Sequence, residues 1–188
     1  IPFIAYIKFL SGNKKIFFSD IQVRTFLKII FISIIFLSIY LIVNSSTQLN
    51  LRAVFFNVIS ILTGTGYVNA QFDSWGGFPL ILFLGLMFIG GCAGSTTCGI
   101  KIFRIQILYS FISNQLKKII YPKGIFVLKY NQNAVDNKFV ASIISFIYMY
   151  LVIFFIITAL LSLTGLDFIT SISGAATSIS NVGPGLGS

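Results

Sequence analysis

The sequence predicts an all-α membrane protein built from repeated units, each a spanning helix, a short helix and a glycine-containing loop. Hydrophobic residues make up 56% of the 188 residues and charged residues only 9%, which is too little polar surface to cover a soluble domain. Long apolar stretches alternate with short basic ones, as they do in multi-pass membrane proteins. The chain also resembles itself at an offset of about 117 residues. Its length suits one membrane domain.

The internal repeat aligns without a gap. It places residues 47–50 on residues 164–167, and the glycine turn at residues 63–67 on the turn at residues 180–184. In each copy a long apolar span, a polar corner, a short amphipathic segment and a small-residue turn follow one another. This is the order of a spanning helix, a re-entrant helix and an extended loop, and it indicates a membrane pore.

The first half of the chain begins with a basic stretch. Residues 1–25 carry four basic residues and one acidic residue, and we interpret them as the end of a preceding inner helix and a cytoplasmic loop. Residues 26–43 are apolar apart from Lys28, which can reach the interface, and their length suits a span of about 20 residues. Asn50 is predicted to cap a helix over residues 51–62, which is too short to span.

The second half repeats these elements after an interruption. Residues 73–77 are predicted to form an external loop with Trp75 as an interface anchor. A further apolar segment starts at Phe78 and is interrupted by ten small or polar residues, 90–99. Apolar character returns at Ile100, and another span, corner, short helix and glycine turn follow. Since residue 1 is Ile and no signal peptide precedes the first span, the chain is expected to be truncated at its N-terminus.

The basic residues predict the orientation. They gather in residues 1–28 and 101–138, with Arg52 on the opposite side. Because cytoplasmic loops hold the excess of Lys and Arg, residues 1–25 and 105–138 are predicted to be cytoplasmic and both glycine turns to face outward. These basic residues flank apolar spans and do not form one docking face, so no nucleic-acid partner is expected.

The glycine turns have the chemistry of a cation site. Irregular backbone at membrane depth occurs only inside protein or beside water, and inward-facing carbonyls can replace the water shell of a cation. Gly66 and Gly183 tolerate the backbone angles that this needs, and each short helix directs the negative end of its dipole toward the site. Uncharged carbonyl rings favour monovalent over divalent cations. The alternative of ordinary connecting loops stays open, but the in-register second copy favours a pore. The candidate ion-binding residues are Thr63, Gly64, Thr65, Gly66, Asn181, Val182 and Gly183.

Three segments carry a resemblance to a known family: residues 63–67, residues 87–101 and residues 180–185. With them the chain resembles the C-terminal half of a TrkH-type potassium-transport subunit of the Trk/Ktr/HKT superfamily. The resemblance implies four span–pore-helix–span repeats with re-entrant filter loops around one pore, and potassium uptake across the bacterial cytoplasmic (inner) membrane. Gly64, which is often Thr in the family, is a departure that is expected to loosen the filter.

The resemblance also divides the chain. Residues 1–25 would end the second repeat, 26–116 form the third repeat with its broken inner helix, and 117–138 form a cytoplasmic basic linker. Residues 139–188 would form the fourth repeat, truncated after its filter. The result is an incomplete four-repeat potassium-channel-like pore. Because two filter strands cannot enclose an ion, this chain by itself is expected not to conduct.

Residues 90–99 allow two interpretations. Gly90 and Gly94 have the small-xxx-small spacing of a close helix–helix contact. However, a continuous helix would lose about 1 kcal/mol for each Gly, and ten small or polar residues exceed what a contact needs. We therefore favour a helix break that forms a mobile loop beneath the filter, and the resemblance implies that this loop is the gate. The candidate gate residues are Gly90, Gly91, Cys92, Ala93, Gly94, Ser95, Thr96 and Gly99.

Three side-chain types near the loop complete the prediction. Cys92 and Cys98 lack the spacing and His neighbours of a zinc site, so small buried thiols are expected. Lys101 and Arg104 either pair with groups at the cytoplasmic mouth or act as positive-inside anchors. The chain has no His and only four acidic residues, so neither an enzyme nor a cofactor in this chain is expected, and potassium is the expected substrate.

The basic linker, residues 117–138, predicts a contact on the cytoplasmic side. The resemblance implies a TrkA-like nucleotide-binding regulatory ring, which would bring NAD or ATP/ADP only through the partner, and a homodimer of full-length subunits. Attraction to anionic membrane lipid, worth about 1 kcal/mol per basic residue, explains the charge equally well. A non-conducting membrane scaffold and a sodium/potassium transporter of the same superfamily remain alternative functions.

Overall fold

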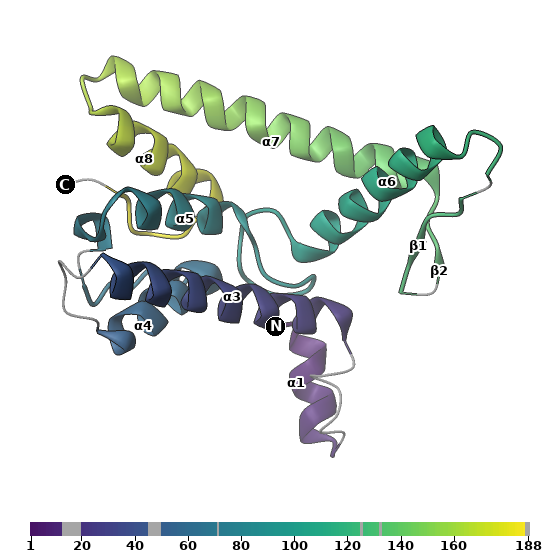
Figure 1. The fold of residues 1–188 in the computed structure, drawn as a ribbon, viewed down its shortest axis with the longest axis horizontal. Helices are drawn as coiled ribbons and strands as arrows, with labels where there is room; N and C mark the ends of the chain where they lie inside the picture. Colours follow the sequence, from purple (N-terminus) through teal and green to yellow (C-terminus); the bar gives the residue numbers. More distant parts are fainter. Residues whose placement is uncertain (13–19, 45–49, 71, 125, 132, 187–188) are drawn as a thin grey trace.

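The structure is a computed structural model that describes residues 1–12, 20–44, 50–70, 72–124, 126–131 and 133–186. It is mostly helical (Figure 1). The elements in chain order are α1 (Phe3–Leu10), α3 (Ile21–Val43), α4 (Leu51–Thr63), η1 (Phe72–Trp75), α5 (Gly77–Phe88), α6 (Ile102–Ile120), β1 (Lys129–Tyr130), β2 (Asn133–Ala134), α7 (Asn137–Leu163) and α8 (Phe168–Ser180).

Two of the described helices are long and apolar enough to cross a bilayer. They are α3 with 23 residues and α7 with 27 residues. Both are apolar around their whole circumference, yet only 28% of α3 and 22% of α7 is buried in the best apolar window. A helix that is apolar on every face and is not buried in protein is suited to contact lipid. The all-α membrane fold class predicted from composition agrees with this arrangement.

The short helices begin and end close to the predicted positions. Asn50 caps α4, as its Oδ1 accepts a hydrogen bond from the Ala53 backbone N–H at 3.2 Å. The first span begins at Ile21, earlier than the predicted residue 26, because Asp20 caps it by accepting from the Gln22 N–H at 2.8 Å. Of the polar corner predicted at residues 44–48, Asn44 follows the end of α3, and residues 45–48 lie outside the described residues.

The predicted basic linker is more ordered than turn signals suggest. Helix α6 continues to Ile120, so that Lys117 and Lys118 lie in its last turn, where cations favour the negative end of the helix dipole. Strands β1 and β2 then pair as an antiparallel hairpin. A small apolar cluster attaches this hairpin to α6 and α7, with Ile107, Leu128, Val140 and Ile143 buried in it.

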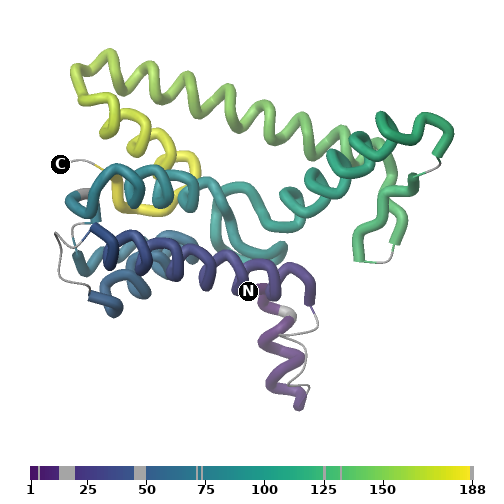
Figure 2. Tube along the Cα trace, in the orientation of Figure 1, coloured from purple at the N-terminus to yellow at the C-terminus, as the bar shows by residue number. Residues whose placement is uncertain are grey.

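The main core lies where the two repeats meet. Helix α4 packs on α3, α8 packs on α7, and α5 contacts both short helices. Figure 2 shows α8 folded back along α7, with α5 beside it. Buried side chains from these helices include Leu37, Val58, Phe83 and Ala176. Trp75, predicted to anchor at the interface, packs its ring against Phe83 with 6.2 Å between the centroids. Segments far apart in sequence thus meet around the glycine turns.

Candidate ion-binding site

Each short helix ends in a left-handed residue and continues into a loop. Helix α4 is followed by Gly64 with φ of 66°, and α8 by Asn181 with φ of 49°. The central glycines of both loops also have positive φ, 80° at Gly66 and 113° at Gly183. Residues with a Cβ rarely adopt these angles. The glycines that the sequence singled out therefore occupy positions where the backbone requires them.

The two glycine loops lie directly against each other. A Cβ placed on Gly66 would be 2.5 Å from the Val182 carbonyl oxygen, and one placed on Gly183 would be 3.1 Å from the Gly66 Cα. A Cβ on Gly64 would stand 3.8 Å from the Asn181 carbonyl oxygen. The structure thus brings together residues of the two loops that are far apart in sequence, and at Gly66 and Gly183 the backbones approach too closely for a side chain.

Hydrogen bonds tie the first loop back to α4. The Ser60 carbonyl accepts from the Thr65 N–H at 2.9 Å, and the Ser60 hydroxyl donates to the Tyr67 carbonyl at 2.6 Å. The buried Asn57 accepts from the Asn69 N–H at 3.3 Å through its Oδ1. The loop is therefore fixed at its beginning, middle and end by polar groups of its own helix.

The second loop is tied to α8 in a similar way. The Thr177 carbonyl accepts from the Val182 N–H at 3.2 Å, and the Thr177 hydroxyl donates to the Gly183 carbonyl at 3.3 Å. Ser173 accepts from the Leu186 N–H at 2.9 Å and donates to the Leu186 carbonyl at 2.7 Å. In both copies, polar side chains of the short helix hold the loop. The bonded Gly183 carbonyl faces its own helix in this arrangement.

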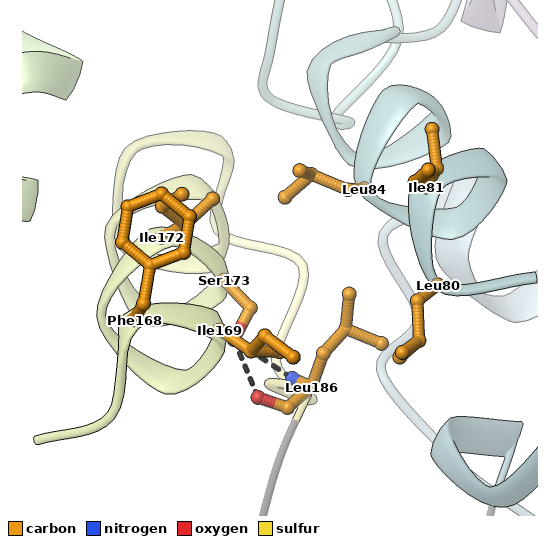
Figure 3. Close-up of a pocket in the computed structure, with 8 residues that line it drawn as sticks. All are labelled: Leu80, Ile81, Leu84, Phe168, Ile169, Ile172, Ser173 and Leu186. Carbon is orange, nitrogen blue, oxygen red and sulfur yellow. Dashed lines mark hydrogen bonds between the residues drawn. The ribbon is translucent and has the colours of Figure 1, made fainter. Parts of the chain in front are cut away.

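Ser173 is expected to be important for the second loop. Figure 3 shows both of its hydrogen bonds to Leu186, whose side chain lies in an apolar pocket of about 210 Å³ between α8 and Leu80 of α5. Replacing Ser173 by Ala leaves the Leu186 N–H and carbonyl without these partners, which costs about 1–3 kcal/mol. We expect a lower thermal unfolding temperature of the purified protein. The exposed Ser178, bonded only to a carbonyl within its own helix, is the matched control, and equal stability of Ser173→Ala and Ser178→Ala would contradict this role.

The remaining predicted filter residues are Thr63 and Thr65. Their hydroxyls lie 2.7 Å apart. Thr63 also lines a cavity of about 650 Å³ together with Ser95, Thr96 and Thr97 and with residues of α1 and α3. A cavity with these hydroxyls beneath the first loop has room for several waters. It lies between the end of α4 and the interrupted helix.

The interrupted helix forms a folded-back loop. Helix α5 ends at Phe88 and α6 begins at Ile102. Between them the Gly90 N–H donates to the Ile100 carbonyl at 2.9 Å, and the Ile100 N–H donates to the Phe88 carbonyl at 2.9 Å. A Cβ on Gly90 would overlap the Cys98 carbonyl oxygen. The small-xxx-small helix contact of Gly90 and Gly94 is therefore wrong, since both residues lie outside the helices.

Polar contacts within the loop centre on a lysine. The Lys101 ammonium donates to the Ser95 carbonyl at 3.0 Å and also to the Thr97 carbonyl. The Thr97 hydroxyl accepts from the Gly91 N–H at 2.9 Å, and the Ser95 hydroxyl donates to the Cys92 carbonyl at 2.6 Å. The partners of Lys101 are thus carbonyls of the loop that precedes it.

The other candidate residues near the loop differ in their surroundings. Cys92 is buried, as expected, but Cys98 is exposed, so the expectation of a buried thiol at Cys98 is wrong. The reason is that the backbone of Cys98, not its side chain, packs against Gly90. Arg104 stacks on the ring of Phe146 in α7 at 3.6 Å from its centroid, a cation–π contact. Within the described residues, no group of three Cys, His or acidic side chains is placed to hold a metal.

Sequence reasoning missed the polar residues that hold the loops. Ser60 and Thr177 bond to the loop backbone in equivalent ways, and they align at the offset of about 117 residues. Each is a hydroxyl residue at the same place in its copy of the short helix. Comparing the two copies for shared polar positions would have found this pair. Gln22, which binds the backbone of the interrupted segment at Ala93, carries no such signal.

The comparisons agree with this geometry. A family model described as "TrkH: Cation transport protein" matches residues 3–188. The Trk system potassium uptake protein TrkI of Halomonas elongata is 37% identical over 188 residues, covering 100% of this chain and 38% of that protein. The Trk system potassium uptake protein TrkH of Escherichia coli strain K12 is 29% identical over 182 residues, covering 95% of this chain and 38% of that protein. These relatives are transport proteins, not enzymes.

A solved structure is similar as well. The crystal structure of the potassium transporter TrkH from Vibrio parahaemolyticus matches with a TM-score of 0.91 at 27% identity, covering 100% of this chain and 41% of that chain. The chain thus spans about 38% of the length of the two relatives above. A family match over nearly all of the chain, a relative that aligns along its whole length and a shared fold give one conclusion: the chain belongs to the TrkH family of cation transport proteins.

Proposed function

We propose that these residues form part of the pore of a potassium-uptake protein in the bacterial cytoplasmic membrane. The observation that carries the proposal is the contact between the loops of Gly66 and Gly183, each placed at the C-terminal end of a short helix. Two helix ends that meet in this way direct partial negative charge toward one place, which suits a cation. The names of the relatives make potassium the expected cation.

The proposed filter uses backbone carbonyls of both loops. Carbonyl oxygens can replace the hydration shell of potassium without a formal charge, and an inward movement gains about 2.3 kcal/mol per charge per 100 mV of inside-negative potential. The filter residues we propose are Thr63, Gly64, Thr65, Gly66, Asn181, Val182 and Gly183. The Gly183 carbonyl would have to turn away from the Thr177 hydroxyl to bind an ion, and the long 3.3 Å hydrogen bond between them makes this change inexpensive.

We assign the segments of the chain accordingly. Residues 26–116 and 139–188 provide the third and fourth of four repeats, after residues 1–25 at the end of the second, and 117–138 is the cytoplasmic linker. The relatives are longer than this chain, and the other two filter strands are assigned to residues outside these 188. The filter loops face outward, and the basic segments face the cytoplasm.

The loop between α5 and α6 is the proposed gate. Its hydroxyl residues line the same cavity as Thr63, so that an ion leaving the filter would meet this loop. A Cβ on Gly64 would stand 3.8 Å from the Thr97 methyl carbon, and this proximity of the loop to a proposed filter residue supports the assignment. The gate residues we propose are Gly90, Gly91, Cys92, Ala93, Gly94, Ser95, Thr96 and Gly99.

We further propose a cytoplasmic regulatory partner. The relatives are subunits of Trk systems by name, and the exposed Lys117, Lys118 and Lys129 lie at the end of α6 and on the hairpin. A TrkA-like nucleotide-binding ring is the proposed partner, with NAD or ATP/ADP bound by that partner. Membrane lipid contacts the spans, and two full-length subunits form a homodimer.

Growth of a bacterium that lacks its own potassium uptake tests the function. The natural full-length gene product and residues 1–188 by themselves are expressed separately, with membrane expression confirmed for both. We expect growth at low potassium with the full-length protein only. Failure of both would favour a non-conducting scaffold, and growth with residues 1–188 would contradict the assignment of two further filter strands elsewhere. Sodium-dependent uptake of equal size would favour a sodium/potassium transporter.

A further inference from the structure

We propose that Gln22 and Tyr130 are positioning residues that connect the cytoplasmic β1–β2 hairpin to the loop between α5 and α6. The connection is a chain that runs by side-chain hydrogen bonds from Tyr130 through Gln106 to Thr25 of α3, and then along the first turns of α3 to Gln22. This inference rests on the gate proposed above and adds the route by which a contact on the cytoplasmic hairpin reaches that gate.

The loop end of the chain is Gln22. Its Oε1 accepts a hydrogen bond from the Ala93 backbone N–H at 2.8 Å. Ala93 lies between the buried Cys92 and the exposed Gly94, which has φ of 72°. Gln22 belongs to the first turn of α3, where Asp20 fixes the helix start. The position of α3 therefore affects a backbone amide in the middle of the loop.

The centre of the chain is the amide of Gln106 in α6. Its Nε2 donates to the Thr25 hydroxyl of α3 at 2.7 Å, and its Oε1 accepts from the Tyr130 hydroxyl at 3.1 Å. Both ends of one amide are thus in use, so a rotation that improves one bond breaks the other. Gln106 couples the hairpin to the same first turns of α3 that carry Gln22.

The hairpin end of the chain is Tyr130. Burial, with a contribution from the negative charge of Asp20, raises the pKa of the Tyr130 phenol. The phenol therefore keeps the proton that it donates at physiological pH. Through the Gln106 amide the phenol is connected to Thr25, one helical turn from Gln22 in α3. Since Gln22 holds Ala93, the first turns of α3 connect Tyr130 to the gate loop.

The hairpin is well placed to receive a signal. Its base is attached to α6 and α7 by Leu128, which packs with Ile107 and Val140, while the adjacent Lys129 is exposed. Figure 1 shows the hairpin projecting from the junction of α6 and α7. A protein that binds the exposed side of the hairpin and shifts it would draw Tyr130 away from Gln106. We expect this shift to loosen the first turns of α3 and the loop amide that they hold.

Single-channel recording of the natural full-length protein with its regulatory partner tests this connection between the hairpin and the loop. Tyr130→Phe removes only the hydroxyl, and Gln22→Met removes the acceptor with little change of shape. Each is expected to raise the open probability in the absence of the activating signal by about fivefold, the effect of one lost hydrogen bond. Unitary conductance and potassium-over-sodium selectivity should stay unchanged, because the filter loops are untouched.

Two further variants separate positioning from a general loss of structure. Gln22→Glu keeps an acceptor for Ala93 and is expected to remain near the wild type. The double variant of Tyr130→Phe and Gln22→Met should match the larger single effect, since members of one network are not additive. Tyr109→Phe, an exposed ring on α6, is the control and should have no effect. Wild-type behaviour of both single variants, or a double effect equal to the product of the singles, overturns the proposal.

The experiments distinguish a wrong connection between hairpin and loop from a wrong gate assignment. A Cβ on Gly91 would overlap the Thr97 hydroxyl within the loop, so Gly91→Ala disturbs the loop directly. If Gly91→Ala alters open probability and Tyr130→Phe does not, the gate assignment stands and the proposed connection from Tyr130 to the loop is wrong. If Gly91→Ala also has no effect on open probability, the gate assignment itself is wrong, and the proposed connection to the gate loses its basis.

Discussion

Gly66→Ser and Gly183→Ser are expected to lower potassium-over-sodium selectivity by about tenfold, equivalent to about 1.4 kcal/mol. Either side chain would press on the opposite loop, since the new Cβ stands 2.5 Å from the Val182 oxygen or 3.1 Å from the Gly66 Cα. Both positions also have positive φ, which is strained for Ser. The carbonyls must therefore move, and a filter depends on their placement.

Reversal potentials of the full-length protein in potassium and sodium gradients measure this effect. Gly85→Ser is the matched control, because a Cβ on Gly85 meets nothing within 4 Å and Gly85 lies inside α5. Membrane insertion should be the same for all three variants, since none adds a charge to a span. Unchanged selectivity in both Gly66→Ser and Gly183→Ser would remove the filter assignment.

Lys101→Met is expected to increase potassium flux about tenfold in the absence of the activating signal. The ammonium donates to the Ser95 and Thr97 carbonyls, and a hydrogen bond from a charged donor contributes about 1.5–3 kcal/mol. Losing both bonds frees the segment that lines the cavity below Thr63. Selectivity should stay constant, because the two glycine loops keep their contacts.

Rubidium uptake into proteoliposomes that contain the full-length protein measures the flux. Lys8→Met removes the same charge from an exposed position in the last turn of α1 and should leave flux near the wild type. Equal flux in Lys101→Met and the wild type would show that the loop does not limit conduction. A fall in selectivity alone would place Lys101 in the filter and not in the gate.

Local features of the fold were predictable from the sequence. The apolar stretches, the Asn50 cap and the turn glycines depend on residues close in the chain, and the structure has α3, α4, α7 and α8 near the expected positions. The start of α3 was missed because a basic and polar stretch concealed the Asp20 cap. The continuation of α6 to Ile120 was missed because turn residues dominate the segment that follows.

The candidate site was predictable in its residues but not in its contacts. The repeat pointed to Gly66 and Gly183, whose positive φ the structure then showed. Nothing local to either turn indicates that a Cβ on one would meet the backbone of the other. The same holds for Lys101, whose charge suggested an anchor but whose partners are loop carbonyls.

The sequence by itself determined the class of protein, the order of spanning and short helices and the central glycines of the loops that follow the short helices. These follow from composition, length and local backbone preference, which act on neighbouring residues. Only the tertiary structure decided that the two glycine loops touch, that Cys98 is exposed and that Gln22 holds Ala93. Such contacts depend on how helices pack across the whole chain, because close packing joins residues that no local pattern relates.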